Sequence, residues 1–143
     1  MTLEESSIFV NLKKLRRVLY TAQFNMTKAD RVIYGTPVME NCGKAIAAFI
    51  LAYTVREKRM AYLEECMGYF YALKTDLEFC ADENIIKFPK KRHTIGSNGE
   101  IIPVESREDT INTGKIELFH LIGEIDGDIC RWRASLAKGQ DRA

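Results

Sequence analysis

Apolar residues recur at alternating spacings of four and three along much of this chain, the pattern of a helix with one buried face. The clearest run lies in residues 111–136, and its apolar positions are Leu118, Ile122, Ile125, Ile129, Trp132 and Leu136. A period near 3.5 residues keeps one stripe turned toward its neighbours over many turns, so the expected partners are other helices crossing at roughly 20°. The pattern predicts a long helix over residues 107–137.

The same spacing predicts a first helix over residues 6–25, with Ser6 or Ser7 as its N-cap. Its apolar positions are Ile8, Leu12, Leu15, Leu19, Ala22 and Met26. A second helix is expected over residues 28–56, beginning after Thr27. Thr36 followed by Pro37 resembles a new helix start, so we expect a short turn that breaks the second helix near residues 35–37.

The apolar sector of the second helix is wider than that of the first. It comprises Val38, Cys42, Ala45, Phe49 and Ala52, flanked by Met39, Ile46, Ile50 and Tyr53. So broad a sector is hard to cover in a small monomeric bundle, which favours contact with another subunit.

A third helix is predicted over residues 59–84. Its apolar positions are Leu63, Met67, Phe70, Leu73, Leu77 and Ala81. The pattern stops at Lys87, and Asn98-Gly99 between β-forming residues favours a long loop or small β-hairpin over residues 87–105. The fold class expected is all-α: an antiparallel up-down-up-down four-helix bundle, one domain over residues 1–143, ending in a basic tail at 138–143.

Composition narrows the functional classes. The 143 residues have a net charge of only +1, so nucleic acid can be attracted only by local clusters of Lys and Arg. The first residues are acidic where a signal peptide is basic, and no apolar run approaches the roughly 18 residues of a membrane span. We therefore expect a cytoplasmic protein without membrane contact.

Three groups of cations are candidate contacts for nucleic acid or a protein partner. They are Lys13, Lys14, Arg16 and Arg17 in the first helix, Lys90, Lys91 and Arg92 in the loop, and Arg131, Arg133 and Lys138 at the end of the last helix. Four cations within five helical positions repel one another by a few tenths of a kcal/mol per pair unless an anion lies among them. A solvated face and a phosphate or partner site both fit this pattern.

Catalytic chemistry is not indicated by any motif. The four cysteines include no C-x-x-C pair and are interpreted as buried thiols, which burial makes poor nucleophiles. Glu117 and His120 have the spacing of a di-iron ligand pair, but such sites need the motif on two helices, and the other histidine, His93, falls in the loop. We predict a non-enzyme with no cofactor or metal; a thiol- or metal-dependent bundle is the enzymatic alternative.

Three segments resemble a known family. They are the first helix from Leu12-Lys13-Lys14 to Tyr20, the Tyr34-Gly35 corner with the apolar run from Ala45 to Tyr53, and the ending from Cys130-Arg131-Trp132-Arg133 to Gln140. Together the chain resembles the four-helix-bundle family that includes the accessory variability determinant proteins of diversity-generating retroelements and the ribosomal-RNA intervening-sequence proteins.

This resemblance implies a homopentamer that binds a retroelement reverse transcriptase and contacts template RNA or its cDNA. The implied contacts are Lys13, Lys14, Arg16, Arg17, Arg131, Arg133 and Lys138. The alternative is an intervening-sequence-type bundle with an RNA-linked or scaffolding role and no reverse transcriptase partner.

Overall fold

The computed structural model describes residues 2–86, 93–95, 99, 101–103 and 107–139, and the chain is all-α with four long helices, as predicted. The long helices are α1 (Ser7–Phe24), α3 (Thr36–Thr54), α4 (Arg59–Asp82) and α5 (Arg107–Ala137). Shorter elements are 3₁₀ turns at Leu3–Glu5 and Arg56–Lys58, the helix α2 (Lys28–Asp30), and the strands β1 (His93–Ile95) and β2 (Ile101–Pro103).

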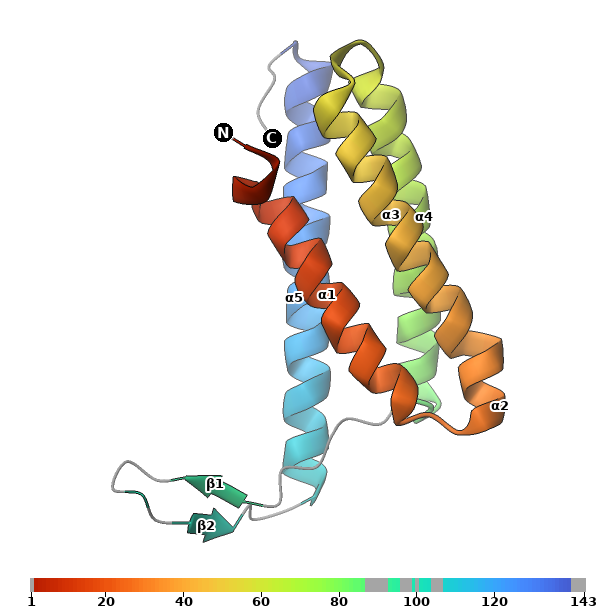
Figure 1. Ribbon diagram of the computed structural model, residues 1–143, viewed down its shortest axis with the longest axis vertical. Coiled ribbons are helices and arrows are strands. Elements are labelled where there is room, and N and C mark those ends of the chain that lie inside the picture. The colour runs from red at the N-terminus through yellow and green to blue at the C-terminus, as the bar shows by residue number, and fades with distance from the viewer. Residues whose placement is uncertain (1, 87–92, 96–98, 100, 104–106, 140–143) are drawn as a thin grey trace.

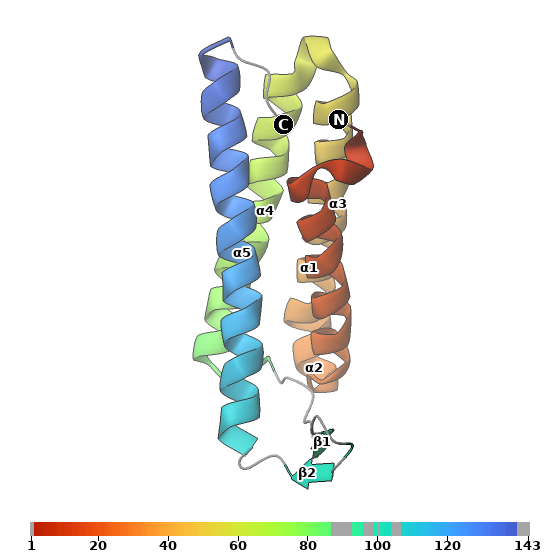
Figure 2. The same cartoon turned by 90° about the vertical axis from the view of Figure 1, so that its left-hand side faces the viewer.

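The four long helices lie side by side, and the chain reverses direction from each to the next (Figure 1). Helix α3 packs closely on α4 and also contacts α1, while α5 contacts both α1 and α4. The view turned by 90° shows the same neighbours, with α4 and α5 on one side and α1 and α3 on the other (Figure 2). Each long helix therefore contacts two others and keeps an outer face.

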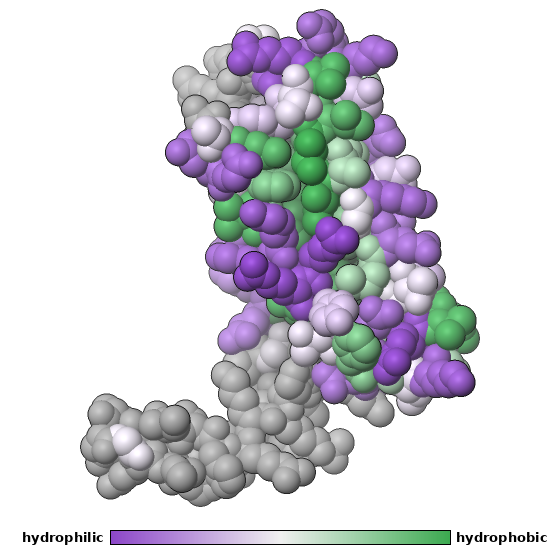
Figure 3. Space-filling view, viewed as in Figure 1, coloured by the Kyte–Doolittle hydropathy of each residue, from purple (hydrophilic) through white to green (hydrophobic). Residues whose placement is uncertain are grey.

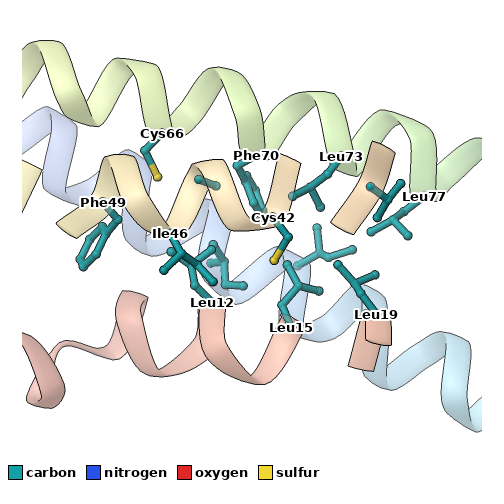
Figure 4. Packing of buried hydrophobic residues seen from close by; sticks show 14 of the residues in the cluster. Leu12, Leu15, Leu19, Cys42, Ile46, Phe49, Cys66, Phe70, Leu73 and Leu77 are labelled. Carbon is teal, nitrogen blue, oxygen red and sulfur yellow. The ribbon is translucent and has the colours of Figure 1, made fainter. Parts of the chain in front are cut away.

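One hydrophobic core fills the space between these helices. Leu12 and Leu15 of α1 point toward Cys42 of α3, and Phe70 and Leu73 of α4 close the other side (Figure 4). The predicted stripe of α5 is confirmed, because Leu118, Ile122, Ile125, Ile129 and Trp132 are each at most 2% exposed. Leu136, the last position of that stripe, is only half-buried.

The start of the second predicted helix is as expected, but its break is not a turn. Thr27 caps α2 by accepting a hydrogen bond from the backbone N–H of Asp30 at 3.2 Å. A π-helical segment, Arg31–Gly35, then runs directly into α3, so Thr36 has helical dihedral angles and is not an N-cap. Pro37 lacks an N–H and its ring crowds the carbonyl of residue 33, a conflict that the wider π-helical turn relieves.

Gly35 lies where this segment touches the end of α1. A Cβ placed on Gly35 would be 3.0 Å from Cγ of Gln23 and 3.2 Å from Sδ of Met26. The absence of a side chain therefore lets α1 and the π-helical segment approach closely.

The broad apolar sector of α3 is largely covered within one chain. Its buried residues are Val38, Cys42, Ala45, Ile46, Ala48, Phe49 and Ala52. Met39 and Ile50 pack against the core from its edge, and Leu51 is 40% exposed. The surface of α3 left for another subunit is thus narrower than the sequence pattern indicates.

The corner between α3 and α4 is closed by a buried arginine. Arg59 donates from Nε to the carbonyl of Ala52 at 2.8 Å and from Nη2 to the carbonyl of Tyr53 at 2.6 Å. These carbonyls belong to the last turn of α3, where no helical N–H can reach them. Arg59 therefore caps α3 from the first residue of α4.

Two details of α5 concern its glycines and its tryptophan. Gly123 and Gly127 suggest a close approach between helices, but a Cβ on Gly123 would meet nothing within 4 Å, and one on Gly127 would meet only the Arg131 side chain of the same helix. Trp132 is buried as expected, against Phe49 and the guanidinium of Arg59. Its indole N–H, however, has no hydrogen-bond partner in the described part of the chain.

Between α4 and α5 the strands β1 and β2 pair antiparallel, with Thr94 opposite Ile102. Gly99, in the connection, has a φ of 84°, a conformation that glycine adopts without strain. Asn98 lies outside the described residues. Among those described, no single helix has both the length and the apolar composition of a membrane span, and the segments Lys28–Thr54 and Arg56–Asp82, bent by 118°, reach that composition only as a pair.

Candidate nucleic-acid interface

The four cations of α1 are all exposed on one helix that has no acidic residue. Lys13, Lys14, Arg16 and Arg17 give the segment Ser7–Phe24 a charge of +4, because four cations stand against no Asp or Glu. The cations lie in the middle of α1, where the space-filling view shows a hydrophilic surface (Figure 3). The sequence cluster is therefore a true surface cluster.

These cations are not neutralised by the rest of the described chain. Lys13 lies over the ring of Phe9, with Nζ 4.6 Å from the ring centroid. Lys14, Arg16 and Arg17 form no ion pair with any described residue. Side chains of like charge held together without counter-charges are available to an external anion.

Two aromatic residues extend this face, and neither was among the contacts predicted from the sequence. Tyr20 is 57% exposed and Phe24 is 55% exposed, and their ring centroids lie 4.8 Å apart in an edge-on arrangement. Positions 13, 17, 20 and 24 follow one another at spacings of four, three and four, and position 16 precedes position 20 by four, so all five share one side of the helix. The spacing of these exposed positions is visible in the sequence, in the same way as the spacing of the buried positions.

Arg31 holds the end of this face in place. Its Nε donates to the carbonyl of Gln23 and its Nη2 to the carbonyl of Phe24, both at 3.1 Å, which caps the last turn of α1. Its guanidinium lies 5.3 Å from the centroid of the Phe24 ring. We call Lys13, Lys14, Arg16, Arg17, Tyr20 and Phe24 the α1 face.

The two predicted arginines of α5 each have an acidic partner within the chain. Arg131 pairs with Asp128 on its own helix, and Arg133 pairs with Glu64 of α4 at 3.1 Å. Because the two arginines are two residues apart, they leave the helix in nearly opposite directions. The pair of Arg133 and Glu64 depends on how α4 packs on α5 and is not visible in the sequence, whereas the i, i+3 spacing of Asp128 and Arg131 was visible there. Lys138, just beyond α5, is exposed.

The remaining predicted cations, Lys90, Lys91 and Arg92, lie outside the described residues. Helix α4, by contrast, has an acidic surface. Its segment has a net charge of −3, with Arg59 and Lys74 against Glu64, Glu65, Asp76, Glu78 and Asp82. The net charge of +1 for the whole chain therefore conceals one basic helix, α1, and two acidic helices, α4 and α5, the second with four cations against six carboxylates.

A polar cluster lies on the surface between α4 and α5. Tyr71 donates its hydroxyl hydrogen to Asp126 at 3.0 Å, and Lys74 pairs with Asp126 at 3.3 Å. Partial burial acts to raise the pKa of Asp126, but the hydrogen bonds from Tyr71 and Lys74 outweigh it and hold that pKa below its usual value. The pKa of Tyr71 is raised, chiefly by its hydrogen bond to Cys130.

Cys130 corrects the interpretation of all four cysteines as buried thiols, because it is exposed. Cys130 directly follows Ile129 of the buried stripe, so it lies on the side of α5 next to that stripe. Its Sγ lies 3.5 Å from Oδ1 of Asp126. The other three are buried and free. Burial raises the pKa of Cys42 and of Cys80 to about 11 and that of Cys66 to about 12, which suppresses thiolate chemistry.

The candidate metal ligand His120 has an acidic neighbour on its own helix. His120 is exposed and lies 2.8 Å from Glu124 on the next turn of α5. Within the ranges that the structure describes, no three His, Cys, Asp or Glu side chains come together as metal ligands would.

Comparison of the chain with protein-family models, curated proteins and solved structures found no match. The exposed cations and aromatic rings of α1 indicate the class of partner. Phosphates of a nucleic acid are the common biological anions that such a row of separate positive charges fits.

Proposed function

We propose that this protein is a cytoplasmic, non-catalytic accessory subunit of a diversity-generating retroelement. It binds template RNA or its cDNA, together with the reverse transcriptase, and assembles into a homo-oligomeric ring, a homopentamer in the family that the sequence resembles. Each subunit is an antiparallel up-down-up-down bundle with a hairpin between α4 and α5. The observation that carries the nucleic-acid part is the α1 face, which has four exposed cations and no acidic residue on its helix.

The mode of binding follows from this charge distribution. Lys and Arg that contact phosphates release condensed counterions, which favours binding without reading the base sequence. Four cations per chain give modest affinity, but a ring presents several copies to one polymer and raises the effective concentration of each later contact. A protein of near-zero net charge can bind a polyanion in this way.

Salt-dependent binding tests the proposal. The variant Lys13→Gln/Arg16→Gln/Arg17→Gln should bind labelled RNA more weakly in fluorescence anisotropy, because phosphate contacts are lost. The slope of log K against log salt should also become shallower, by about 0.7 for each single-strand contact or about 0.9 for each duplex contact.

The matched control is Arg131→Gln/Arg133→Gln, which removes cations that are already paired with Asp128 and Glu64. This control should change the slope less than the α1 variant. Equal slopes for the α1 variant and the wild type would overturn the assignment of nucleic-acid binding to α1.

The partner distinguishes the proposed function from its alternative, an intervening-sequence-type bundle. A reverse transcriptase encoded beside this protein, with template and variable repeats, should co-purify with it. Nucleic-acid binding without any such neighbour or co-purification would favour the alternative.

A further inference from the structure

Tyr20 and Phe24 are unusual among the aromatic residues of the described chain because both are more than half exposed. They sit one helical turn apart, directly after Arg16 and Arg17 on the same side of α1. An exposed aromatic ring does not stabilise the fold by burial, and its flat apolar surface is available to a ligand. The face therefore combines separate positive charges with flat rings.

The charge around these rings indicates what kind of partner they meet. Phe79, another exposed aromatic, stands on the acidic helix α4 beside Glu78. Tyr20 and Phe24 instead stand on a helix of charge +4, with the guanidinium of Arg31 against the Phe24 ring. Charge complementarity thus favours a polyanion, and the flat rings favour one that carries flat rings of its own.

The relative orientation of the two rings limits the form of that polyanion. Their planes are 80° apart, so two bases stacked one on each ring cannot be parallel to one another. Successive bases in a duplex are parallel and enclosed by pairing, whereas those of a single strand can turn outward separately. A duplex can reach the cations but not both rings.

We propose that the α1 face binds single-stranded nucleic acid, with bases stacked on Tyr20 and Phe24 while Arg16 and Arg17 contact the adjoining phosphates. This inference rests on the proposed nucleic-acid-binding function and adds the class of strand that is bound. Arg31 is a positioning residue, since its bonds to the carbonyls of Gln23 and Phe24 fix the end of α1 beneath the Phe24 ring. The face runs from Lys13 to Phe24, about 16 Å along the helix.

Three probes of the same length separate phosphate contact from stacking. They are a 12-nucleotide uridine single strand, a strand of equal length whose central positions are abasic, and a 12-base-pair RNA duplex. Binding of each is measured by anisotropy for the wild type, for Tyr20→Ala/Phe24→Ala, and for the control Phe79→Ala, with circular dichroism to verify folding.

The aromatic variant should bind the uridine strand at least about 25-fold more weakly, because two stacked bases are lost and each contributes at least about 5-fold. Its affinity for the duplex and for the abasic strand should change less than 2-fold, and Phe79→Ala should match the wild type with all three probes. In Tyr20→Trp, the added exposed indole should be quenched by the uridine strand and not by the duplex, with the affinity retained.

Other outcomes contradict the inference in distinguishable ways. An equal loss of affinity for all three probes, or none for any, overturns stacking while leaving the Lys13→Gln/Arg16→Gln/Arg17→Gln test of nucleic-acid binding intact. A change in native mass or in binding to anionic vesicles, with unchanged binding of the uridine strand, would instead identify these rings as a protein or lipid contact. If no probe binds the wild type, the proposed function itself fails.

Discussion

Cys42 and Cys66 illustrate how single residues of this fold respond to their surroundings. Both thiols lie in the core between α3 and the helices packed on it (Figure 4). Burial raises their pKa values from 9.0 to about 11 and about 12, because a thiolate in an apolar core loses its hydration. Each position is therefore filled by a small apolar group at neutral pH.

These two thiols predict a loss of stability in alkaline solution. Below pH 9 they are protonated in both the folded and the unfolded chain, so their contribution is fully present. Between pH 9 and the folded pKa values, the unfolded chain releases protons that the folded chain keeps, and the free energy of unfolding falls by up to about 1.4 kcal/mol per pH unit for each thiol.

Urea unfolding at pH 8 and pH 10.5 measures this effect. The variant Cys42→Ala/Cys66→Ala should lose less stability between the two pH values than the wild type, although it starts from a lower value. Other groups titrate alike in both proteins, so an equal loss in both would contradict the assignment to these thiols.

At the scale of elements, the corner between α3 and α4 depends on one side chain. Replacing Arg59 by Met keeps the apolar volume but leaves the carbonyls of Ala52 and Tyr53 without the donors they have now. We expect a loss of about 3 kcal/mol in the free energy of unfolding, since a buried hydrogen bond to a charged group contributes about 1.5–3 kcal/mol.

Chemical denaturation followed by helical circular dichroism tests this expectation. Arg59→Lys should recover only part of the loss, because an ammonium cannot reproduce the planar fork of the guanidinium. The exposed neighbour Arg56 provides the control, and Arg56→Met should stay within about 0.5 kcal/mol of the wild type. A similar small change for Arg59→Met would show that the capping bonds contribute little.

The contact of Arg59 with α3 is also an example of a feature that could not be predicted from the sequence. Periodicity located the buried stripes, because each helix must turn its apolar side to the others whatever its exact neighbours are, and Leu12 and Leu15 are fully buried as expected. Nothing in the sequence around residues 56–59 reveals that Arg59 reaches back to α3. Capping across a corner is a tertiary contact, invisible to a repeat pattern.

Some features of the candidate site could likewise be predicted from the sequence, and others could not. The α1 cations could be predicted because a helix without acidic residues supplies no counter-charge of its own. The ion pair of Arg133 could not, because Glu64 lies 69 positions earlier in the chain and meets it only when α4 packs on α5. The exposure of Cys130 and the π-helical segment likewise depend on helix rotation and on how Pro37 is accommodated.

The whole molecule is electrostatically polar, with charge +4 on α1 and −3 on α4. These two helices are not among the close neighbours in the bundle, since α3 and α5 each lie between them. Attraction between the two charged surfaces therefore adds little to the stability of one chain. Both charged surfaces therefore remain available for contacts outside the chain.

The ring proposed above makes the strength of nucleic-acid binding depend on assembly. Light scattering at micromolar concentration should give a native mass that is a multiple of the 16.4 kDa chain. Leu51 is the most exposed large apolar residue of α3, so if α3 meets the next subunit, Leu51→Glu should place an unpaired charge in that contact and dissociate the ring.

The dissociated variant should also bind long RNA at least about 10-fold more weakly and with a shallower salt dependence, although its α1 face is unchanged. The physical reason is that fewer linked copies contact the same polymer, so the gain from effective concentration is lost. Ala72→Glu, which adds the same charge at an exposed position on α4, is the control. A wild-type mass equal to one chain would contradict the ring, and RNA affinity would then have to come from a single α1 face.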